Sequence, residues 1–222
     1  MDAILDKMPL DVRVVKPEKI VTLLKPGELG AMLDWKVFDP KTGIVTSEGT
    51  KKSESFLKAF LQLLFVNMIF NPSNAPISIT DITPAARNIY QWLSNAAKGT
   101  FNMEAAAALV TNGIIIGTGI TAPTISDSKI ETIIPHATMN YSAQSFAAPA
   151  ADATTSQVTL TRNFSNVSGG NVTVNEIALY CQARDTAGTA RSLCIIRDKI
   201  TGGILVPNGQ TLTINYRPQA VA

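Results

Sequence analysis

The stretch from residue 172 to residue 216 constrains the fold of this chain more than any other part of the sequence. Four apolar runs rich in β-forming residues alternate there with turn residues: VTVNEIALYCQARDTAGTARSLCIIRDKITGGILVPNGQTLTINY. Short runs bounded by turn signals are typical of strands in an antiparallel sheet. The last two runs flank Pro207-Asn208-Gly209-Gln210, which predicts a hairpin turn. Arg217-Pro218 then predicts the end of the sheet.

A loop near residues 187–188 sets the expected register of the first hairpin in this stretch. Folding the chain there places Leu179 opposite Ile196 and Cys181 opposite Cys194. The facing cysteines allow a disulfide, but in a reducing compartment we expect two small buried thiols.

Glu176 and Arg197 fall on the same face of the predicted hairpin, diagonally across from each other. An acid/base role for Glu176 is one interpretation. A carboxylate beside an arginine has a lowered pKa, however, and is a poor general acid. We therefore favour an ion pair that fixes the strand register.

Upstream of this stretch, the sequence predicts further β structure. The strands or hairpins expected there cover residues 31–48, 77–82, 113–119, 131–134, 138–146 and 157–164. In the last of these, Val158, Leu160 and Phe164 alternate toward the core. Residues 83–93 fit either a helix or the return strand of a hairpin, and the hairpin is favoured because its neighbours are β.

Residues 53–70 predict one helix, which Ser53 or Ser55 can cap. Its apolar side chains cover most of the circumference, and a helix of that kind is usually buried. A membrane span needs about 20 apolar residues, and this run is shorter and interrupted by polar residues.

Two short β-prone runs separated by Lys16-Pro17 occupy the first 30 residues. We expect an extended N-terminal arm over residues 1–30, either crossing a neighbouring subunit or packed on its own domain. Residues 31–222 then form a single β-rich domain. The predicted fold is mainly β: an antiparallel β-sandwich or jelly-roll-like body, one buried α-helix at about 53–70, and the arm.

The composition favours close packing between proteins over binding to nucleic acid or membranes. Only 16% of the 222 residues are charged, so the surface is rich in uncharged groups that are easier to desolvate. The net charge of +2 is too small for a nucleic-acid footprint. The first residues, MDAILDKMPLDVRV, do not resemble a signal peptide, so we expect synthesis in the cytoplasm.

A search for catalytic, cofactor and metal motifs predicts none of these sites. Gly117, Gly119 and Ala122 match the pattern G-x-G-x-x-A, but Pro123 and a Thr/Ser-rich tract follow where a dinucleotide site needs a helix. His136 is the single histidine and is expected in a turn or at the surface. Without clustered ligands, no metal site is expected.

Several segments, taken in order, resemble virion structural proteins of tailed bacteriophages. They are KSESFLKAFLQLL, NGIIIGTGITAPTISDSKIET, VTLTRNFSNVSGGNVTVNEIALY, SLCIIRD and VPNGQTLTINY, and together they span residues 52–216. The resemblance implies assembly rather than catalysis.

From the resemblance we expect a structural, non-catalytic virion component that associates with copies of itself and with other virion proteins. Its place would be that of an accessory capsid (decoration) protein or of a head–tail or tail component. The alternative is a receptor- or carbohydrate-binding module at a tail or fibre tip. Aromatic residues make up only 6% of the chain, and neither Trp35 nor Trp92 lies in the loops of the terminal sheet, which argues against that alternative.

Overall fold

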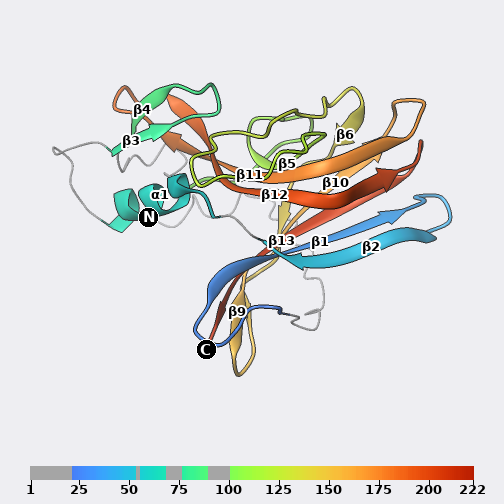
Figure 1. Ribbon diagram of the computed structural model, residues 1–222, viewed down its shortest axis with the longest axis horizontal. Helices are drawn as coiled ribbons and strands as arrows, with labels where there is room; N and C mark the ends of the chain where they lie inside the picture. The colour runs from blue at the N-terminus through green and yellow to red at the C-terminus, as the bar shows by residue number, and fades with distance from the viewer. Residues whose placement is uncertain (1–21, 54–55, 69–76, 90–100) are drawn as a thin grey trace, which may run out of the picture.

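The computed structural model describes residues 22–53, 56–68, 77–89 and 101–222, and the fold is mainly β, as the sequence predicts (Figure 1). Within these ranges, eight strands form a large sheet in the order β2-β1-β13-β10-β6, with β7, β8 and β9 at its margins. A small sheet has the order β12-β11-β5, and β3 and β4 form a separate hairpin.

The bounds of the elements follow the chain. The large sheet contains β1 (Leu29–Phe38), β2 (Val45–Lys52), β6 (Met139–Tyr141), β7 (Ser145–Phe146), β8 (Ala150–Ala151), β9 (Thr155–Gln157), β10 (Leu160–Asn166) and β13 (Thr211–Val221). The small sheet contains β5 (Gly113–Gly117), β11 (Val172–Arg184) and β12 (Ala190–Val206). The remaining elements are α1 (Lys58–Met68), β3 (Ile77–Thr80) and β4 (Ala86–Ile89).

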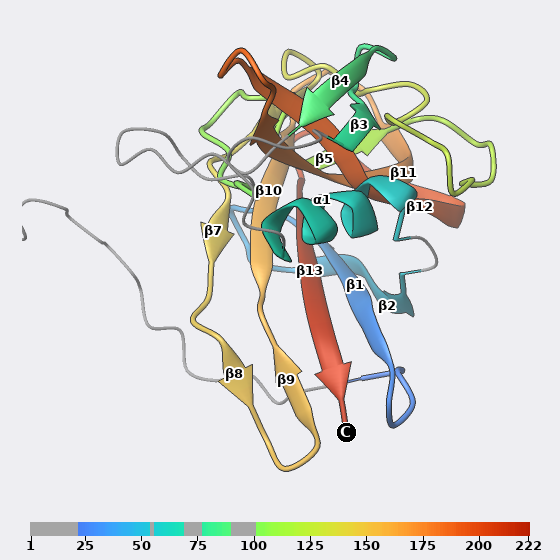
Figure 2. The same cartoon turned by 90° about the vertical axis from the view of Figure 1, so that its left-hand side faces the viewer.

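The two sheets share one hydrophobic core, and the views in Figures 1 and 2 show the small sheet lying over the large one. Alternate residues of β1, β10 and β13 point into this core, among them Leu33, Phe164 and Ile214. Residues of β11 are buried on both faces from 177 to 181, because loops cover the side away from the large sheet. The arrangement is consistent with the predicted β-sandwich body.

The expected hairpins before residue 120 are confirmed. β1 pairs with β2 across the turn at residues 39–43, and β3 pairs with β4, so residues 83–89 form a turn and a return strand rather than a helix. Residues 90–93 lie outside the described residues. β5 is fully buried, as the apolar run predicts.

Three of the later strand predictions need correction. The strand predicted at 138–146 is divided into β6 and β7, which both pair with β10. Residues 131–134 make only an isolated bridge, between Ile133 and Gly117, because the N–H groups of Glu131 and Thr132 donate to the buried carboxylate of Glu176 instead of to a neighbouring strand. The strand predicted at 157–164 breaks at residues 158–159, and Val158 is exposed. This break lies opposite Pro218, whose missing N–H could not continue a ladder there.

The prediction that the sheet ends at Arg217-Pro218 is wrong. Strand β13 continues through Pro218 to Val221. Pro218 lies opposite Ala31 of β1, and the carbonyl of Ala31 accepts its hydrogen bond from Ser53 on the other side. The proline thus occupies a position that needs no backbone donor toward β1.

The register of β11 and β12 is partly as predicted. Leu179 faces Ile196, but Cys181 faces Leu193 rather than Cys194. A bulge after the Leu179–Ile196 pair gives β12 one extra residue, and every pair from there to the loop is therefore moved by one position. Both cysteines are buried free thiols.

The second hairpin predicted around Pro207 is wrong, because the two strands that flank the turn do not pair. Pro207 and Gln210 do form a turn, through a 3.1 Å hydrogen bond, but β12 and β13 belong to different sheets. The connection from β10 to β11 crosses between the sheets at the same end. Asn166 holds the two crossings together, because its side chain donates to Val206 O and its backbone carbonyl accepts from Gly209 N.

Helix α1 is shorter and more exposed than predicted. It begins at Lys58, because the residues before it bind strands: Ser53 N donates to Ala31 O and Leu57 N donates to Ile195 O. The Ser53 hydroxyl donates to buried Asp198 instead of capping the helix. The predicted burial of the helix is confirmed for one side of α1 only, and its other apolar side chains are exposed.

The described part of the predicted arm packs on its own domain. Leu24 joins Met32 and Val221 in a small apolar cluster, and Gly27 N donates to Val221 O at 2.7 Å. β1 already begins at Leu29. Residues 1–21 lie outside the described residues.

Candidate functional site

The buried ion pair predicted between Glu176 and Arg197 is confirmed and belongs to a larger charge cluster. Arg197 Nε lies 2.9 Å from a carboxylate oxygen of Glu176, and both side chains are buried. The guanidinium also lies 2.6 Å from Asp127 and 3.6 Å from Glu131, which come from the loop after β5. Adjacent strands β11 and β12 thus present the pair, and the loop closes over it.

Glu176 also binds the backbone of that loop. Its carboxylate accepts hydrogen bonds of 2.9–3.0 Å from the N–H groups of Gly119, Glu131 and Thr132. A carboxylate that accepts several such bonds and one guanidinium has little capacity left for another ligand. Its role is to fix the loop from residue 118 to residue 132 on the small sheet.

The same contacts explain the glycines of the G-x-G-x-x-A match. A Cβ atom at Gly117 would lie 2.5 Å from Thr132 O, and one at Gly119 would lie 2.3 Å from Glu176 Oε1. The glycines are needed for close approach to a carboxylate within the chain. A loop and not a helix follows them, so the dinucleotide interpretation is rejected on the geometry it requires.

The pKa shifts in the cluster favour permanent charges. Burial opposes ionisation of Asp127, but hydrogen bonds from Thr124 and Arg197 outweigh it and lower the pKa of Asp127 below its ordinary value. Hydrogen bonds from Thr121 lower the pKa of Glu131. Burial works against the charge on Arg197, yet its carboxylate partners raise its pKa. These groups hold their charges at neutral pH and stabilise structure.

Arg162 is one of several described charged residues whose burial was not predicted from the sequence. It lies on β10 between Leu160 and Phe164, on the face that points into the core. The guanidinium donates five hydrogen bonds of 2.7–3.1 Å to backbone carbonyls, those of Ala106, Leu109, Asn112, Ile114 and Ser142. Its carbon also lies 4.9 Å from the centre of the Tyr141 ring.

Burial lowers the pKa of Arg162 to about 10, so the side chain remains a cation at neutral pH. The signal in the sequence was the period of two along β10, which places an arginine at a core position between two apolar residues. Such a residue needs a full set of acceptors. Here the acceptors are carbonyls of the irregular segment of residues 106–112, of Ile114 at the start of β5 and of Ser142.

The cysteines, the histidine and Trp35 also make contacts that stabilise the fold. Burial raises the pKa of Cys181 and of Cys194, which disfavours the reactive thiolate. His136 lies in a turn, as predicted, and its Nδ1 accepts a 3.0 Å hydrogen bond from Tyr141 N. Trp35 covers Gly49 directly across the β1–β2 pair, where a Cβ would lie 2.1 Å from its ring.

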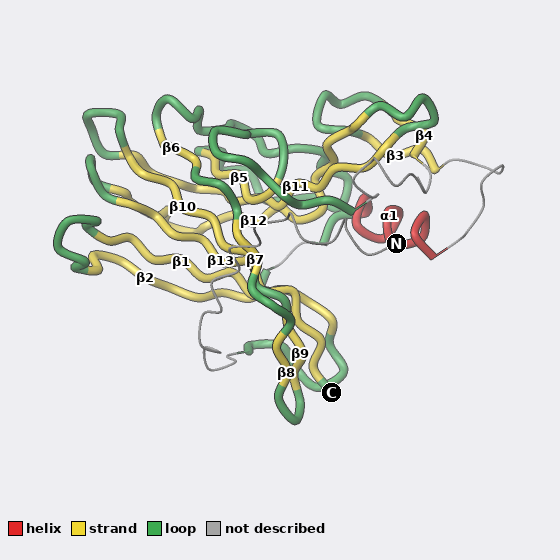
Figure 3. Tube along the Cα trace, turned by 180° about the vertical axis from the view of Figure 1, so that it is seen from behind, coloured by secondary structure: helices red, strands yellow, loops and turns green. Residues whose placement is uncertain are grey.

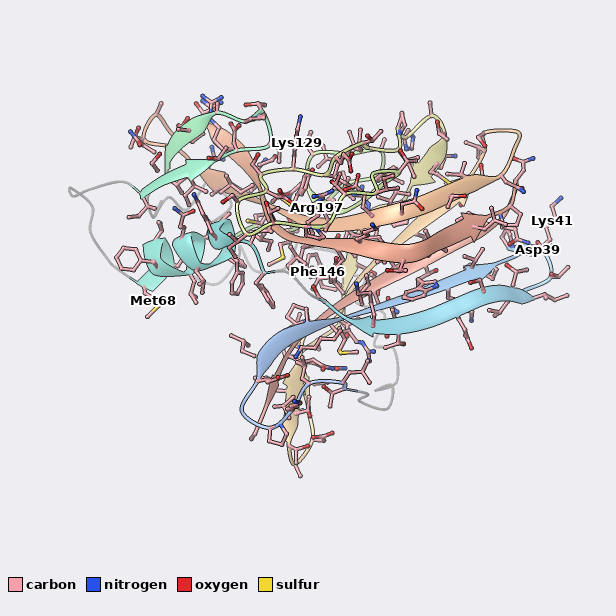
Figure 4. The ribbon with its side chains drawn as sticks, in the orientation of Figure 1. Asp39, Lys41, Met68, Lys129, Phe146 and Arg197 are labelled. Carbon is pink, nitrogen blue, oxygen red and sulfur yellow. The ribbon has the colours of Figure 1, made fainter. Side chains whose placement is uncertain are left out.

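A second apolar stripe lies on the outward side of α1. Ala59, Leu63 and Val66 form the buried stripe, whereas the outward side chains at positions i, i+3, i+4 and i+7 are exposed. They are Leu61 (63% exposed), Leu64 (39%), Phe65 (48%) and Met68 (74%). Figure 4 shows Met68 at the outer end of the helix, pointing away from both sheets. We call these four residues the outer stripe.

The described residues contain no group of three or more His, Cys, Asp or Glu side chains that could hold a metal ion. Within the same ranges, no helix has the length and the apolar character that crossing a membrane requires. Comparison with known protein families, with curated proteins and with solved structures found no match to this chain.

Proposed function

We propose that this chain is a structural, non-catalytic component of a tailed-bacteriophage virion, synthesised in the host cytoplasm. It assembles through protein–protein contacts with copies of itself and with other virion proteins. Its place is that of an accessory capsid (decoration) protein or of a head–tail or tail component. The resemblance of the segments between residues 52 and 216 to such proteins supports the proposal, together with the internal, structural use of the buried charges.

The outer stripe is the observation that carries the proposal furthest. Its four side chains are together a little more than half exposed, and full burial of one such side chain contributes about 1.5–3 kcal/mol. Covering the stripe would therefore contribute roughly 3–6 kcal/mol. That is too little to hold a stable dimer in dilute solution, but repeated contacts in a particle add together.

Particle composition tests the proposal. Virus particles are purified from cultures that produce this chain, and mass spectrometry measures its peptides relative to the major shell protein. We expect the chain at a fixed ratio to the shell protein after repeated density-gradient steps. Its loss from the purified particles overturns the proposal.

A pair of variants then tests the outer stripe. The double change Leu61→Ser and Phe65→Ser removes two large apolar groups from the surface and should reduce incorporation into particles. Ile120→Ser is the matched control, because Ile120 is similarly exposed but lies in a loop. Equal incorporation of both variants, with both folded by circular dichroism, excludes the stripe as the contact.

A further inference from the structure

Strand β2 forms one edge of the large sheet, and among the described residues no strand pairs with its side away from β1 (Figures 1 and 3). Ser53 N donates to Ala31 O, and the regular register from this pair up to Val37 gives the odd-numbered residues of β2 the hydrogen bonds to β1. The even-numbered residues Glu48, Thr50 and Lys52 therefore direct their N–H and C=O groups toward the open edge.

The side chains of these three residues share one face of the sheet. It is the polar face, turned away from the small sheet, where Thr50 Oγ1 donates to Asp34 at 2.8 Å. Lys52 Nζ lies 2.6 Å from Glu28 on the same face. The open edge thus combines unpaired backbone groups with a negative and a positive side chain four residues apart.

We propose that β2 pairs with β2 of a second copy of this chain, antiparallel about a twofold axis at Thr50, so that two large sheets join edge to edge. The pairing rests on the proposed assembly function and assigns it a surface. Antiparallel pairing requires outward-directed residues to face each other, so only even-numbered residues can be opposite. Isologous contacts of this kind close as dimers.

Charge selects the register. With Thr50 opposite Thr50 of the second copy, Glu48 of each copy faces Lys52 of the other, which gives two opposite-charge pairs. A shift of two residues along each strand, centred on Glu48, would instead place two carboxylates together. Charged residues on an edge strand discourage indiscriminate pairing, and among the twofold registers only the one centred on Thr50 places opposite charges across from each other.

A charge exchange between two variants tests the pairing. In Glu48→Lys chains, two lysine pairs face each other in the dimer, and in Lys52→Glu chains, two glutamate pairs do so. Each variant alone should self-associate at least about tenfold more weakly than the wild type at low ionic strength. An equimolar mixture of the two restores both opposite-charge pairs, and sedimentation velocity should show the dimer again.

Lys41→Glu is the matched control, because it makes the same charge change at the tip of the β1–β2 hairpin, outside the pairing strand (Figure 4). It should dimerise like the wild type. The mixture separates pairing from a structural effect, because loss of the Lys52–Glu28 contact in one chain cannot be repaired by adding another chain.

A wild-type chain that remains monomeric at high concentration overturns the pairing, as does a mixture no more associated than its components. Particle incorporation is measured separately. A chain found in particles without the charge-exchange effect refutes only the β2 contact. A chain that shows the effect but is missing from particles refutes only the proposed function.

Discussion

Replacing Arg162 should destabilise the protein more than replacing a partly exposed arginine such as Arg87 or Arg191. Hydrogen bonds from a charged donor contribute about 1.5–3 kcal/mol each, so the five bonds together represent roughly 7–15 kcal/mol. Burial of the guanidinium opposes them by several kcal/mol. Because Arg162→Met removes the donor of five carbonyls, two of them in buried hydrogen bonds, we expect a net loss of about 3–5 kcal/mol.

Arg162→Lys should reduce the stability less than Arg162→Met does. Lysine has three donors on a single nitrogen, so Arg162→Lys can satisfy at most three of the five carbonyls. We expect a loss of about 2–3 kcal/mol. Arg191→Met is the control, since Arg191 is 26% exposed and its ion-pair partner is Asp185, and it should lose about 1 kcal/mol or less.

Thermal and urea unfolding measure these differences. In a domain of this size 1 kcal/mol moves Tm by about 2–4 °C, so Arg162→Met should lower Tm by about 6–20 °C. Hydrogen exchange should accelerate first in residues 106–114, which the guanidinium holds. If Arg162→Met unfolds within about 1 kcal/mol of the wild type, the guanidinium does not organise this segment and the reasoning is refuted.

Three further predictions follow from the described contacts. Gly119→Ala should destabilise by about 1–3 kcal/mol, because its Cβ would clash with the buried carboxylate, whereas Gly170→Ala, which meets nothing within 4 Å, should change stability by less than about 0.5 kcal/mol in urea unfolding. Because the folded-state pKa of Asp127 is below its ordinary value of 3.8, its contribution to stability is complete above that value and disappears as the pH falls through the folded pKa. Tm should therefore hold between pH 7 and pH 5 and fall below about pH 4, less steeply in Asp127→Asn; a steeper fall in that variant would contradict the assignment. Cys181 and Cys194 should resist a thiol reagent in the folded protein and react fully in denaturant, so rapid native labelling of either would disprove their burial.

Local sequence patterns predicted the strands well and their partners less well. The alternation that identifies β11 and β12 is a property of each strand, and the loop between them determines the first pairs, such as Leu179 with Ile196. The bulge that shifts Cys194 depends on packing against other elements. The turn after Pro207 has the same chemistry whether the chain returns to the same sheet or crosses to another, so the sheet switch could not be read from it.

In the candidate site, too, contacts within one hairpin could be predicted from the sequence and contacts with distant segments could not. The Glu176–Arg197 pair could be predicted because both residues belong to one hairpin, whereas Asp127 joins them from a distant loop. Arg162 had a readable signal in its core-facing position. The outer stripe was visible as apolar residues, but an apolar helix surface has the same pattern whether its own chain or another molecule covers it.

The pairing of β1 with β13 has a consequence for how the protein is made. It joins residues 29–38 to residues 211–221, so the middle of the large sheet is built from segments about 180 residues apart in the chain. During translation β1 therefore remains unpaired with β13 until β13 has left the ribosome. Contacts so distant in sequence make folding slow. The open edges of β1 and β2 are then exposed to neighbouring nascent chains, where the charges of β2 decide which strands can pair.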